Sequence, residues 1–249
     1  MGRRFSVVIH TRVQVRDAHP GYSAAKSGDA EAALTLAESL LSGPATAALR
    51  TIVAGQDALL LPVTAIETTG FNAIPDAMAQ VLARELGWGI SAGGIVQNNK
   101  VGHTRTRAYN RLVTPASFEG PVEPAARYVL VDDHVGLGGT LANLKGHIET
   151  SGGIVVAMTT LTESRDGRHI APRPVTLNVL RDRHGEGLEH LRREQIGHGL
   201  DGLTNLEGEI LGREPSLDAI RDRLAQAAVE ARGRGLQPAA HARGQGLTP

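Results

Sequence analysis

The sequence contains no cysteine, and this absence excludes several kinds of chemistry at once. Disulfide bonds, zinc sites with cysteine ligands and thiol catalysis all need a cysteine side chain. A chain without cysteine also fits a reducing compartment, so we expect a cytoplasmic protein. Aromatic residues make up only 3% of the chain, so its core must be built from Leu, Val, Ile and Ala.

Long apolar runs and an excess of charge of one sign are also missing. No stretch approaches the roughly 20 apolar residues that span a bilayer, so we expect no membrane partner. The 26 basic and 26 acidic residues cancel, which argues against nucleic acid as a partner. What is present is a chain of 249 residues, of which 41% are hydrophobic, and this is enough for a packed globular core.

Apolar runs of strand length alternate with helical periodicity along the chain. The run at 58–63 is continuously apolar, which is typical of a strand buried on both faces. Helical patterns start near Asp29, Pro75 and Ser216, residue types that favour the first turn of a helix. This order predicts an α/β fold with a doubly wound, mostly parallel sheet and a helical C-terminal part. Further strands are expected at 5–11, 128–133 and 152–161.

Some segments give other signals. We expect Gly43 to end the helix that Asp29 begins. The stretch at 64–72 is polar and is interpreted as a loop, and 98–112 as an exposed loop. Residues 174–180 alternate between apolar and polar types, which predicts an edge strand.

The stretch YVLVDDHVGLGGT, at 128–140, joins two adjacent carboxylates to a glycine-rich turn. The glycines let the backbone approach a ligand, and Thr140 and the next helix add a hydroxyl and a positive dipole end. These features predict a phosphate cradle. Asp132 and Asp133 do not suit a phosphate, so we expect them to accept hydrogen bonds from sugar hydroxyls or to bind Mg²⁺ through water. The stretch therefore predicts a site for a phosphorylated sugar.

Two other glycine-rich loops fit this stretch less well. A dinucleotide-binding turn has its glycines directly after the strand and its acid about 20 residues later, whereas here the acids come first. A Walker A loop has a lysine before its Thr, and Gly139 stands there instead. A structural strand-to-helix turn with a solvated acid pair is the remaining alternative.

The same stretch resembles the signature of the type I phosphoribosyltransferases, although Leu137 replaces their usual Thr or Ser and His134 a common aliphatic residue. The resemblance implies that Asp132 and Asp133 hold the ribose hydroxyls of 5-phosphoribosyl-1-pyrophosphate (PRPP). The same resemblance implies that they contact Mg²⁺ only indirectly, through the PRPP to which the ion is bound. It also implies a set of residues around the 5-phosphate. These are Val135, Gly136, Leu137, Gly138, Gly139 and Thr140.

A second stretch, GFNAIPDAMAQVLARELG, resembles the Gly-Phe-Asn segment of the ComF-like branch of that family. The segment with Arg111 and Phe118 has a residue pattern similar to that of the same branch, so the resemblance covers roughly residues 55–162. This chain cannot have the cysteine-rich zinc module of that branch, and IETT stands where the branch has basic residues. A competence function is therefore not inherited.

In this family, two loops contact the pyrophosphate, and the resemblance places seven residues of this chain there. They are Thr64, Thr68, Thr69, Lys100, His103, Arg105 and Arg107. For Thr68 and Thr69 a helix N-cap is the alternative, and for each basic residue a solvated surface charge. A polar N-terminal group either forms a hood that selects the acceptor or serves in capping and at the surface. It consists of His10, Arg12, His19, Tyr22 and Lys26.

The resemblance implies a phosphoribosyltransferase that uses PRPP and Mg²⁺ to modify a nitrogen nucleophile, with a nucleobase as the expected acceptor. The alternatives are a non-catalytic regulatory protein that senses PRPP or a nucleotide, and a hydrolase on the same fold. The family also suggests a homodimer. The expected parts are an N-terminal extension or hood at 1–54, a phosphoribosyltransferase-like core at 55–182, a helical part at 183–232 and a disordered tail at 233–249.

Overall fold

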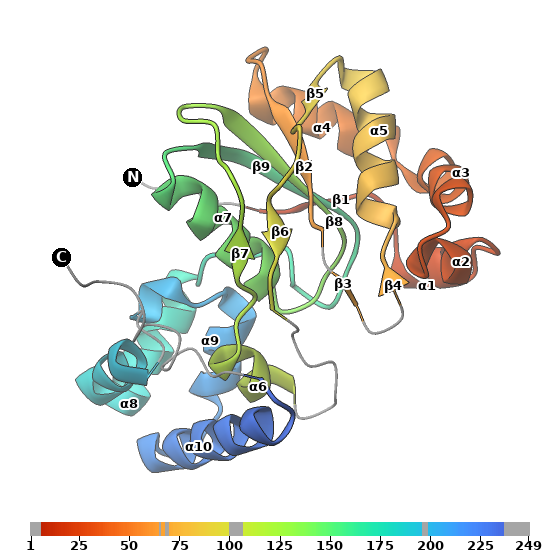
Figure 1. Cartoon of the computed structure of the whole chain (residues 1–249). Helices are drawn as coiled ribbons and strands as arrows, with labels where there is room; N and C mark the ends of the chain where they lie inside the picture. Colours follow the sequence, from red (N-terminus) through yellow and green to blue (C-terminus); the bar gives the residue numbers. More distant parts are fainter. Residues whose placement is uncertain (1–5, 65, 68–69, 100–106, 196–198, 237–249) are drawn as a thin grey trace.

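A five-stranded sheet lies at the centre of the computed structural model, which describes residues 6–64, 66–67, 70–99, 107–195 and 199–236 (Figure 1). Every neighbouring pair of strands in this sheet is parallel. The predicted α/β class with a mostly parallel sheet is confirmed. In spatial order the strands are β5 (Gly89–Ile90), β2 (Leu59–Pro62), β8 (Arg127–Val135), β9 (Ile154–Glu163) and β1 (Val8–Ile9).

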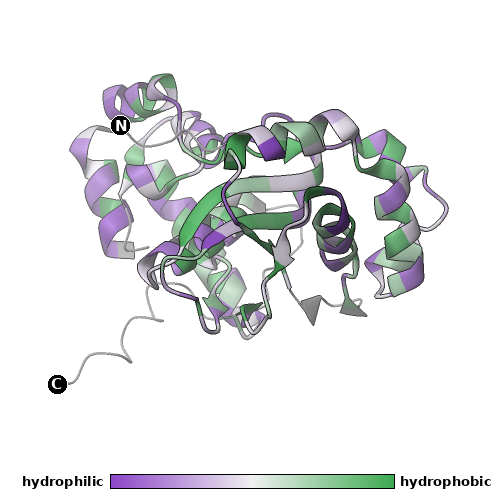
Figure 2. Ribbon diagram, turned by 90° about the horizontal axis from the view of Figure 1, so that it is seen from above, coloured by the Kyte–Doolittle hydropathy of each residue, from purple (hydrophilic) through white to green (hydrophobic). Residues whose placement is uncertain are grey.

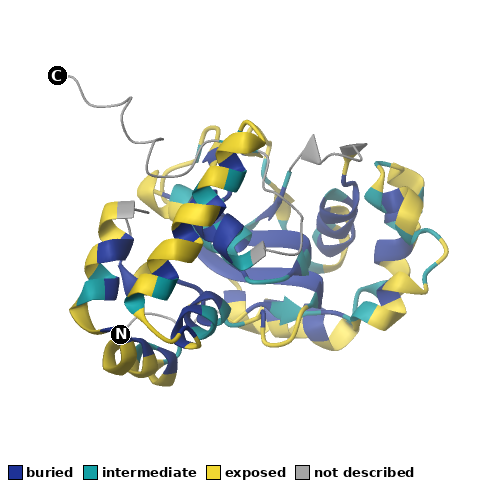
Figure 3. Cartoon of the chain, turned by 90° about the horizontal axis from the view of Figure 1, so that it is seen from below, coloured by how far each residue is buried: buried dark blue, intermediate teal, exposed yellow. Residues whose placement is uncertain are grey.

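Helices cover both faces of the sheet, and alternate residues of β8 point to different layers. Val129 and Val131 belong to one apolar cluster, whereas Tyr128 and Leu130 belong to a second cluster with α7 (Gly139–Thr150). Figures 2 and 3 show the consequence: the central strands are largely apolar and buried, while the helices expose their polar outer faces. The first cluster includes residues of α3 (Ala30–Leu40), α4 (Gly43–Val53) and α5 (Ile74–Leu86).

The N-terminal part, expected as an extension, is built into the α/β layers. Its strand β1 pairs with β9 at one edge of the sheet, α4 packs on β1 and β9, and α3 packs against α5. Two short helices, α1 (Val13–Asp17) and α2 (Tyr22–Lys26), connect β1 to α3. Asp29 caps α3 as predicted, but Gly43 begins α4 instead of ending α3, because Pro44 suits a first helical turn.

Two expected loops contain regular structure. The polar stretch at 64–72 includes the antiparallel pair β3 (Ile66–Glu67) and β4 (Gly70–Phe71). The expected exposed loop at 98–112 ends in a helix, α6 (Arg107–Val113), whose Tyr109, Leu112 and Val113 are buried. A second antiparallel pair, β6 (Val96–Gln97) and β7 (Phe118–Glu119), lies on the α7 side of the sheet.

The C-terminal part is helical, as predicted, and has an apolar cluster of its own together with α6. Figure 1 shows this part gathered at one end of the α/β layers. The predicted helix after Ser216 is present, with Ile220, Leu224 and Ala227 buried. The elements are α8 (Pro174–Gln195), η1 (Leu200–Gly202), α9 (Asn205–Gly212) and α10 (Leu217–Gly233).

The predicted edge strand at 174–180 was wrong, because these residues form the start of α8. The apparent alternation came from Val175 and Val179, which are exposed, 64% and 44% respectively. The helix is interrupted by a kink at Gly185, which has φ 60° and ψ −158°. Before the kink Thr176 and Leu180, four positions apart, are buried, and after it Leu188 and Leu191, three positions apart, are buried, which is the spacing of a helix in each segment. A short alternating window could not distinguish the two periods.

Removing the cap of α10 should cost about 1 kcal/mol of unfolding free energy. The Ser216 hydroxyl accepts a hydrogen bond from the Ala219 backbone N–H at 3.1 Å, so Ser216→Ala leaves that donor without its partner. Ser42→Ala is the matched control, because Ser42 precedes α4 without a side-chain capping bond. Urea unfolding of both variants measures the difference, and equal losses would contradict the capping role.

Candidate functional site

The carboxyl end of β8 carries the predicted acid pair. The strand continues past Asp133 to Val135, so Asp132 and His134 pair in register with Thr160 and Thr162 of β9. The neighbouring parallel strands end at the same edge, which is where ligands bind in sheets of this kind. The glycine turn and α7 follow directly.

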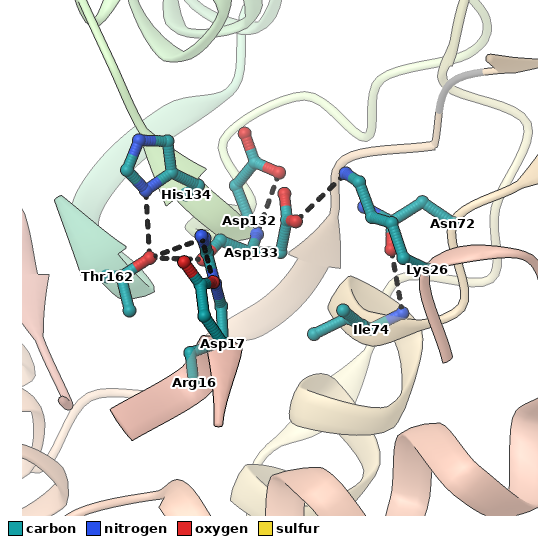
Figure 4. Close-up of polar contacts among 9 residues, drawn as sticks. All are labelled: Arg16, Asp17, Lys26, Asn72, Ile74, Asp132, Asp133, His134 and Thr162. Carbon is teal, nitrogen blue, oxygen red and sulfur yellow. Dashed lines mark hydrogen bonds and ion pairs between the residues drawn. The ribbon is translucent and has the colours of Figure 1, made fainter. Parts of the chain in front are cut away.

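Asp133 forms an ion pair with a lysine from the N-terminal part. Its Oδ2 lies 2.9 Å from Nζ of Lys26, the last residue of α2, and the Asp133 side chain is 8% exposed (Figure 4). The Gly-Phe-Asn segment helps to hold α2 in this place, since the Ala73 N–H donates to the Ala25 carbonyl. Three segments far apart in the sequence therefore meet at the acid pair.

Asp132 is buried beside Asp133 and accepts a hydrogen bond from the Asp133 backbone N–H at 2.8 Å. Burial raises the pKa of Asp132 well above its usual 3.8, and the negative charge of Asp133 raises it further. The two adjacent acids therefore differ: Asp133 has a cationic partner, whereas Asp132 favours its neutral form.

Replacing Asp132 by Asn should stabilise the fold at neutral pH. The folded state binds the Asp132 proton more tightly than the unfolded chain, whose pKa is near 3.8, so stability falls as the pH rises above that value. Asn keeps an oxygen for the Asp133 N–H and carries no charge. We expect Asp132→Asn to raise the melting temperature by a few degrees at pH about 7, with a smaller gain near pH 4. A gain that does not depend on pH would contradict this cause.

A second polar network lies next to the pair, also at this edge of the sheet (Figure 4). Buried Arg16 of α1 donates from Nη1 to the Thr162 hydroxyl at 2.8 Å, and the same hydroxyl lies 2.8 Å from Nδ1 of His134. The other ring nitrogen of His134 lies 2.8 Å from the Ser164 hydroxyl. Burial lowers the pKa of His134, and the positive charge of Arg16 lowers it further, so the ring is neutral at pH 7.

The glycine turn has the predicted strand–turn–helix form, and α9 packs against one side of it. Gly138 has a φ of 88°, a conformation that favours glycine, and precedes α7. The Thr204 hydroxyl donates to the Leu137 carbonyl at 2.6 Å. The buried Glu207 carboxylate lies close to Gly139, where an added Cβ would be 3.0 Å from its Oε1. Gly136 and Leu137 instead line an open cavity.

Only one of the predicted pyrophosphate residues can be placed in detail. Thr64 follows β2 at the same edge, half-buried, and its carbonyl accepts from the Gln97 N–H at 2.9 Å. Arg107 begins α6, but its side chain is outside the described residues. The remaining five, Thr68, Thr69, Lys100, His103 and Arg105, lie outside them as well.

The N-terminal polar group divides between the site and the interior. Lys26 contacts the acid pair, and the Tyr22 ring centroid lies 4.7 Å from Cζ of Arg16. His10 is buried, with Nδ1 accepting from the Ser42 N–H at 3.0 Å. No sequence motif marks Arg16, Thr162 or Ser164. The register of β8 and β9 places Thr162 beside His134, and α1 brings Arg16 to the Thr162 hydroxyl.

The described residues contain no group of three or more His, Asp or Glu side chains that could hold a metal ion by themselves. Two adjacent carboxylates nevertheless fit a Mg²⁺ ion that takes its other ligands from substrate phosphates and water. Across the same residues, every helix is too short or too polar to cross a membrane.

Comparison with known proteins gives two relatives in sequence, while no family model matches the chain. The chain is 42% identical over 215 residues to "Protein TraN" of Escherichia coli, covering 86% of this chain and 48% of that protein. It is 38% identical over 141 residues to an uncharacterized protein of Haemophilus influenzae, covering 57% of this chain and 31% of that protein. The chain thus spans less than half the length of either relative.

Two solved structures are also similar to this chain. Both are adenine phosphoribosyltransferases, with 16% and 23% sequence identity, and the second comes from Thermoanaerobacter pseudethanolicus. The matches cover 55% and 54% of this chain and 71% and 70% of those chains. Each has a TM-score of 0.32, which is too low to support an inference about function.

Proposed function

We propose that this chain binds PRPP at the carboxyl edge of the sheet and transfers its phosphoribosyl group to a nitrogen nucleophile, expected to be a nucleobase. One observation carries the proposal. The buried acid pair at the end of β8 runs directly into a glycine turn and the first turn of α7. Acceptors for hydroxyls and a place for a phosphate therefore lie within a few residues of each other. We also propose that the segment at 70–87 corresponds to the Gly-Phe-Asn segment of the ComF-like branch and that the protein forms a homodimer.

The two acids have different tasks in this mechanism. Asp133, held by Lys26, is the carboxylate that accepts hydrogen bonds from the ribose hydroxyls. Asp132 lies beside it and favours the neutral form, so it can donate a hydrogen bond to the ligand through its O–H or accept one through its other oxygen. The negative charge of Asp133 favours the positive charge that develops on the ribose as the bond from C1 to the pyrophosphate breaks and the bond to nitrogen forms.

The remaining parts bind and orient the substrate. The turn at Gly136 and Leu137 holds the 5-phosphate, so that binding far from C1 positions the reacting carbon. Lys26 supplies positive charge at this edge, in addition to the predicted basic loop residues. Mg²⁺, associated with Asp132 and Asp133 through water, would neutralise the charge of the pyrophosphate.

The second candidate is a protein that senses a phosphoribosyl ligand without converting it. It is favoured by α9, which covers the Gly138–Gly139 side of the turn with Thr204 and buried Glu207. A turn that is covered by a helix suits a sensor, whose ligand stays bound, better than an enzyme, which must release its product in each catalytic cycle. Binding without turnover would support this candidate, and product analysis would separate both from a hydrolase.

Calorimetric titration with PRPP, with and without Mg²⁺, tests the proposal. We expect binding that depends on Mg²⁺ and is weakened at least about tenfold by Gly136→Val, because a side chain there meets Arg111 Nη1, 3.2 Å from the position of an added Cβ. Gly146→Val on α7, where an added Cβ meets nothing within 4 Å, is the matched control. A folded wild type that does not bind PRPP would refute the assignment.

A further inference from the structure

The turn that follows β9 packs against the glycine turn at the end of β8. The Ser164 N–H donates to the Val135 carbonyl at 2.9 Å. At Gly167 an added Cβ would lie 2.5 Å from the carbonyl oxygen of Gly136, so a glycine is needed for the two turns to approach this closely. Ser164 is therefore held beside the turn that the proposed function assigns to the 5-phosphate.

Ser164 and the glycine turn line the same cavity, whose volume is about 520 Å³. Gly136 has no side chain and that of Leu137 is apolar, so neither offers a side-chain donor to a phosphate oxygen. Among the described residues that line the cavity, Ser164 is the one with a hydroxyl. This donor comes from the segment after β9 and not from the turn itself.

The charges around the cavity suit an anion. Arg165 follows Ser164 directly and lines the cavity, and so do Arg111 and Arg213. The one acid among the described lining residues, Glu209, lies 3.6 Å from Arg213. The Ser164 hydroxyl thus lies at a place where a phosphate is favoured, and its value as a donor depends on where its proton points.

The direction of the Ser164 proton is set by a chain of hydrogen bonds that starts at Arg16. Arg16 donates from Nη1 to the Thr162 hydroxyl, so this oxygen acts as an acceptor. The Thr162 proton then has two acceptors within reach, Nδ1 of His134 at 2.8 Å and the Asp133 carbonyl at 3.5 Å. The shorter contact is the stronger one, so Thr162 donates to Nδ1.

A His134 ring that accepts at Nδ1 carries its proton on Nε2, which lies 2.8 Å from the Ser164 hydroxyl. This N–H donates to the Ser164 oxygen and leaves the Ser164 proton for a ligand. A doubly protonated ring would donate from the same nitrogen, so the orientation does not depend on the charge of His134. The opposite tautomer would take the Ser164 proton at Nε2, and the Ser164 oxygen would then repel a phosphate.

We propose that Ser164 is a specificity-determining residue of the proposed transferase, whose hydroxyl donates to the 5-phosphate of the substrate. A network of positioning residues behind it holds its proton toward that phosphate. These residues are Arg16, Thr162 and His134. The inference rests on the proposed function, which places the 5-phosphate at the glycine turn, and it gives a task to a network that the acid pair does not use.

Calorimetric titration of the full chain with PRPP and with ribose 5-phosphate, each with Mg²⁺, tests the contact. We expect Ser164→Ala to weaken both ligands about tenfold, because one hydrogen bond to a charged group is lost. Ser164→Thr keeps the hydroxyl and should stay within about threefold of wild type. Ser151→Ala is the matched control, because Ser151 is an exposed serine between α7 and β9, at the other end of β9. A loss for PRPP alone would place the hydroxyl at the pyrophosphate and overturn the assignment.

The positioning residues have a spectroscopic signature of their own. Long-range proton–nitrogen NMR reports the tautomer of the His134 ring, and we expect its proton on Nε2 in the wild type. Thr162→Val is nearly isosteric but removes the donor to Nδ1, so we expect a mixture of tautomers and about fivefold weaker binding of PRPP. Thr162→Ser should restore both. Thr162 is fully buried, so thermal unfolding checks that the variants fold. A proton on Nδ1 in the wild type would overturn the positioning role.

The two ligands separate this inference from the proposed function. A wild type that binds both ligands, with Ser164→Ala binding them equally well, would overturn the inference and leave the transferase intact. A wild type that binds ribose 5-phosphate but not PRPP, with weaker binding in Ser164→Ala, would refute the transferase and support the phosphate contact. A wild type that binds neither ligand would refute both.

Discussion

Replacing Asp133 by Asn should lower phosphoribosyl transfer on the order of 100-fold, the size of effect seen when one electrostatic contact to a transition state is removed. Asn has nearly the same shape, so the ribose contacts are kept in part, but the negative charge that faces the developing positive charge is lost. Lys26 then lies beside a neutral amide, which makes the site less favourable still for a cation. Steady-state turnover of PRPP with a panel of nucleobases measures the loss.

Asp17→Asn is the control for this experiment. Asp17 is a carboxylate at the same edge; its side chain is 51% exposed, and the hydrogen bonds that buried Arg16 donates to Oδ1 can be accepted by the amide oxygen of Asn. We expect it to change turnover by less than about threefold, since the charge that is removed is largely exposed to solvent. If Asp133→Asn turned over as fast as wild type while folded, Asp133 would have no catalytic task. A wild type that binds PRPP without turnover would favour the sensing protein.

Acidification should destabilise the protein through His10, a residue of the N-terminal polar group for which the sequence left a hood role and a capping or surface role open. Burial lowers the pKa of His10 from 6.5 to about 4. The unfolded chain takes up this proton as the pH falls below 6.5, whereas the folded state resists it down to about pH 4. The free energy of unfolding therefore falls across this window, by about 3 kcal/mol at 1.36 kcal/mol per pKa unit.

Urea unfolding of wild type and His10→Asn between pH 7 and 4 measures this contribution. The Asn side chain does not titrate, and its oxygen can accept the hydrogen bond that the Ser42 N–H donates to Nδ1 of His10. We expect the variant to lose about 3 kcal/mol less than wild type over that range. His190→Asn is the control, because His190 has an exposed side chain on α8. Equal losses in wild type and His10→Asn would show that another group causes the acid sensitivity.

The charge of Asp132 has opposite effects on stability and on the proposed ligand binding. Asp132 is buried with a raised pKa, so its charge opposes folding at neutral pH. A chain selected for stability alone would carry an amide or an apolar residue there. An acid at this position is explained if the ligand needs it. Measuring both stability and PRPP binding of Asp132→Asn separates the effect of the charge on folding from its effect on the ligand.

The sequence by itself determined those elements whose signals are local. The apolar run before Asp132, the glycines after it and the spacing of Leu141, Leu144 and Ile148 specified strand, turn and helix within a few residues of one another. The N-caps Asp29 and Ser216 could also be predicted from the sequence, because a capping hydrogen bond joins residues three positions apart. The parallel sheet followed from the order of strands and helices.

Only the tertiary structure decided which distant side chains complete the site. Lys26 reaches Asp133 across 107 positions and Arg16 reaches Thr162 across 146, and no periodicity relates such residues. The same holds for Arg111, Arg165 and Arg213, which three separate segments bring to one cavity. The local pattern at 174–180 even favoured the wrong element, since packing of Leu180 against α9 and α10 selected the helix. Contacts at long sequence separation depend on how whole elements pack, and local propensity does not encode that packing.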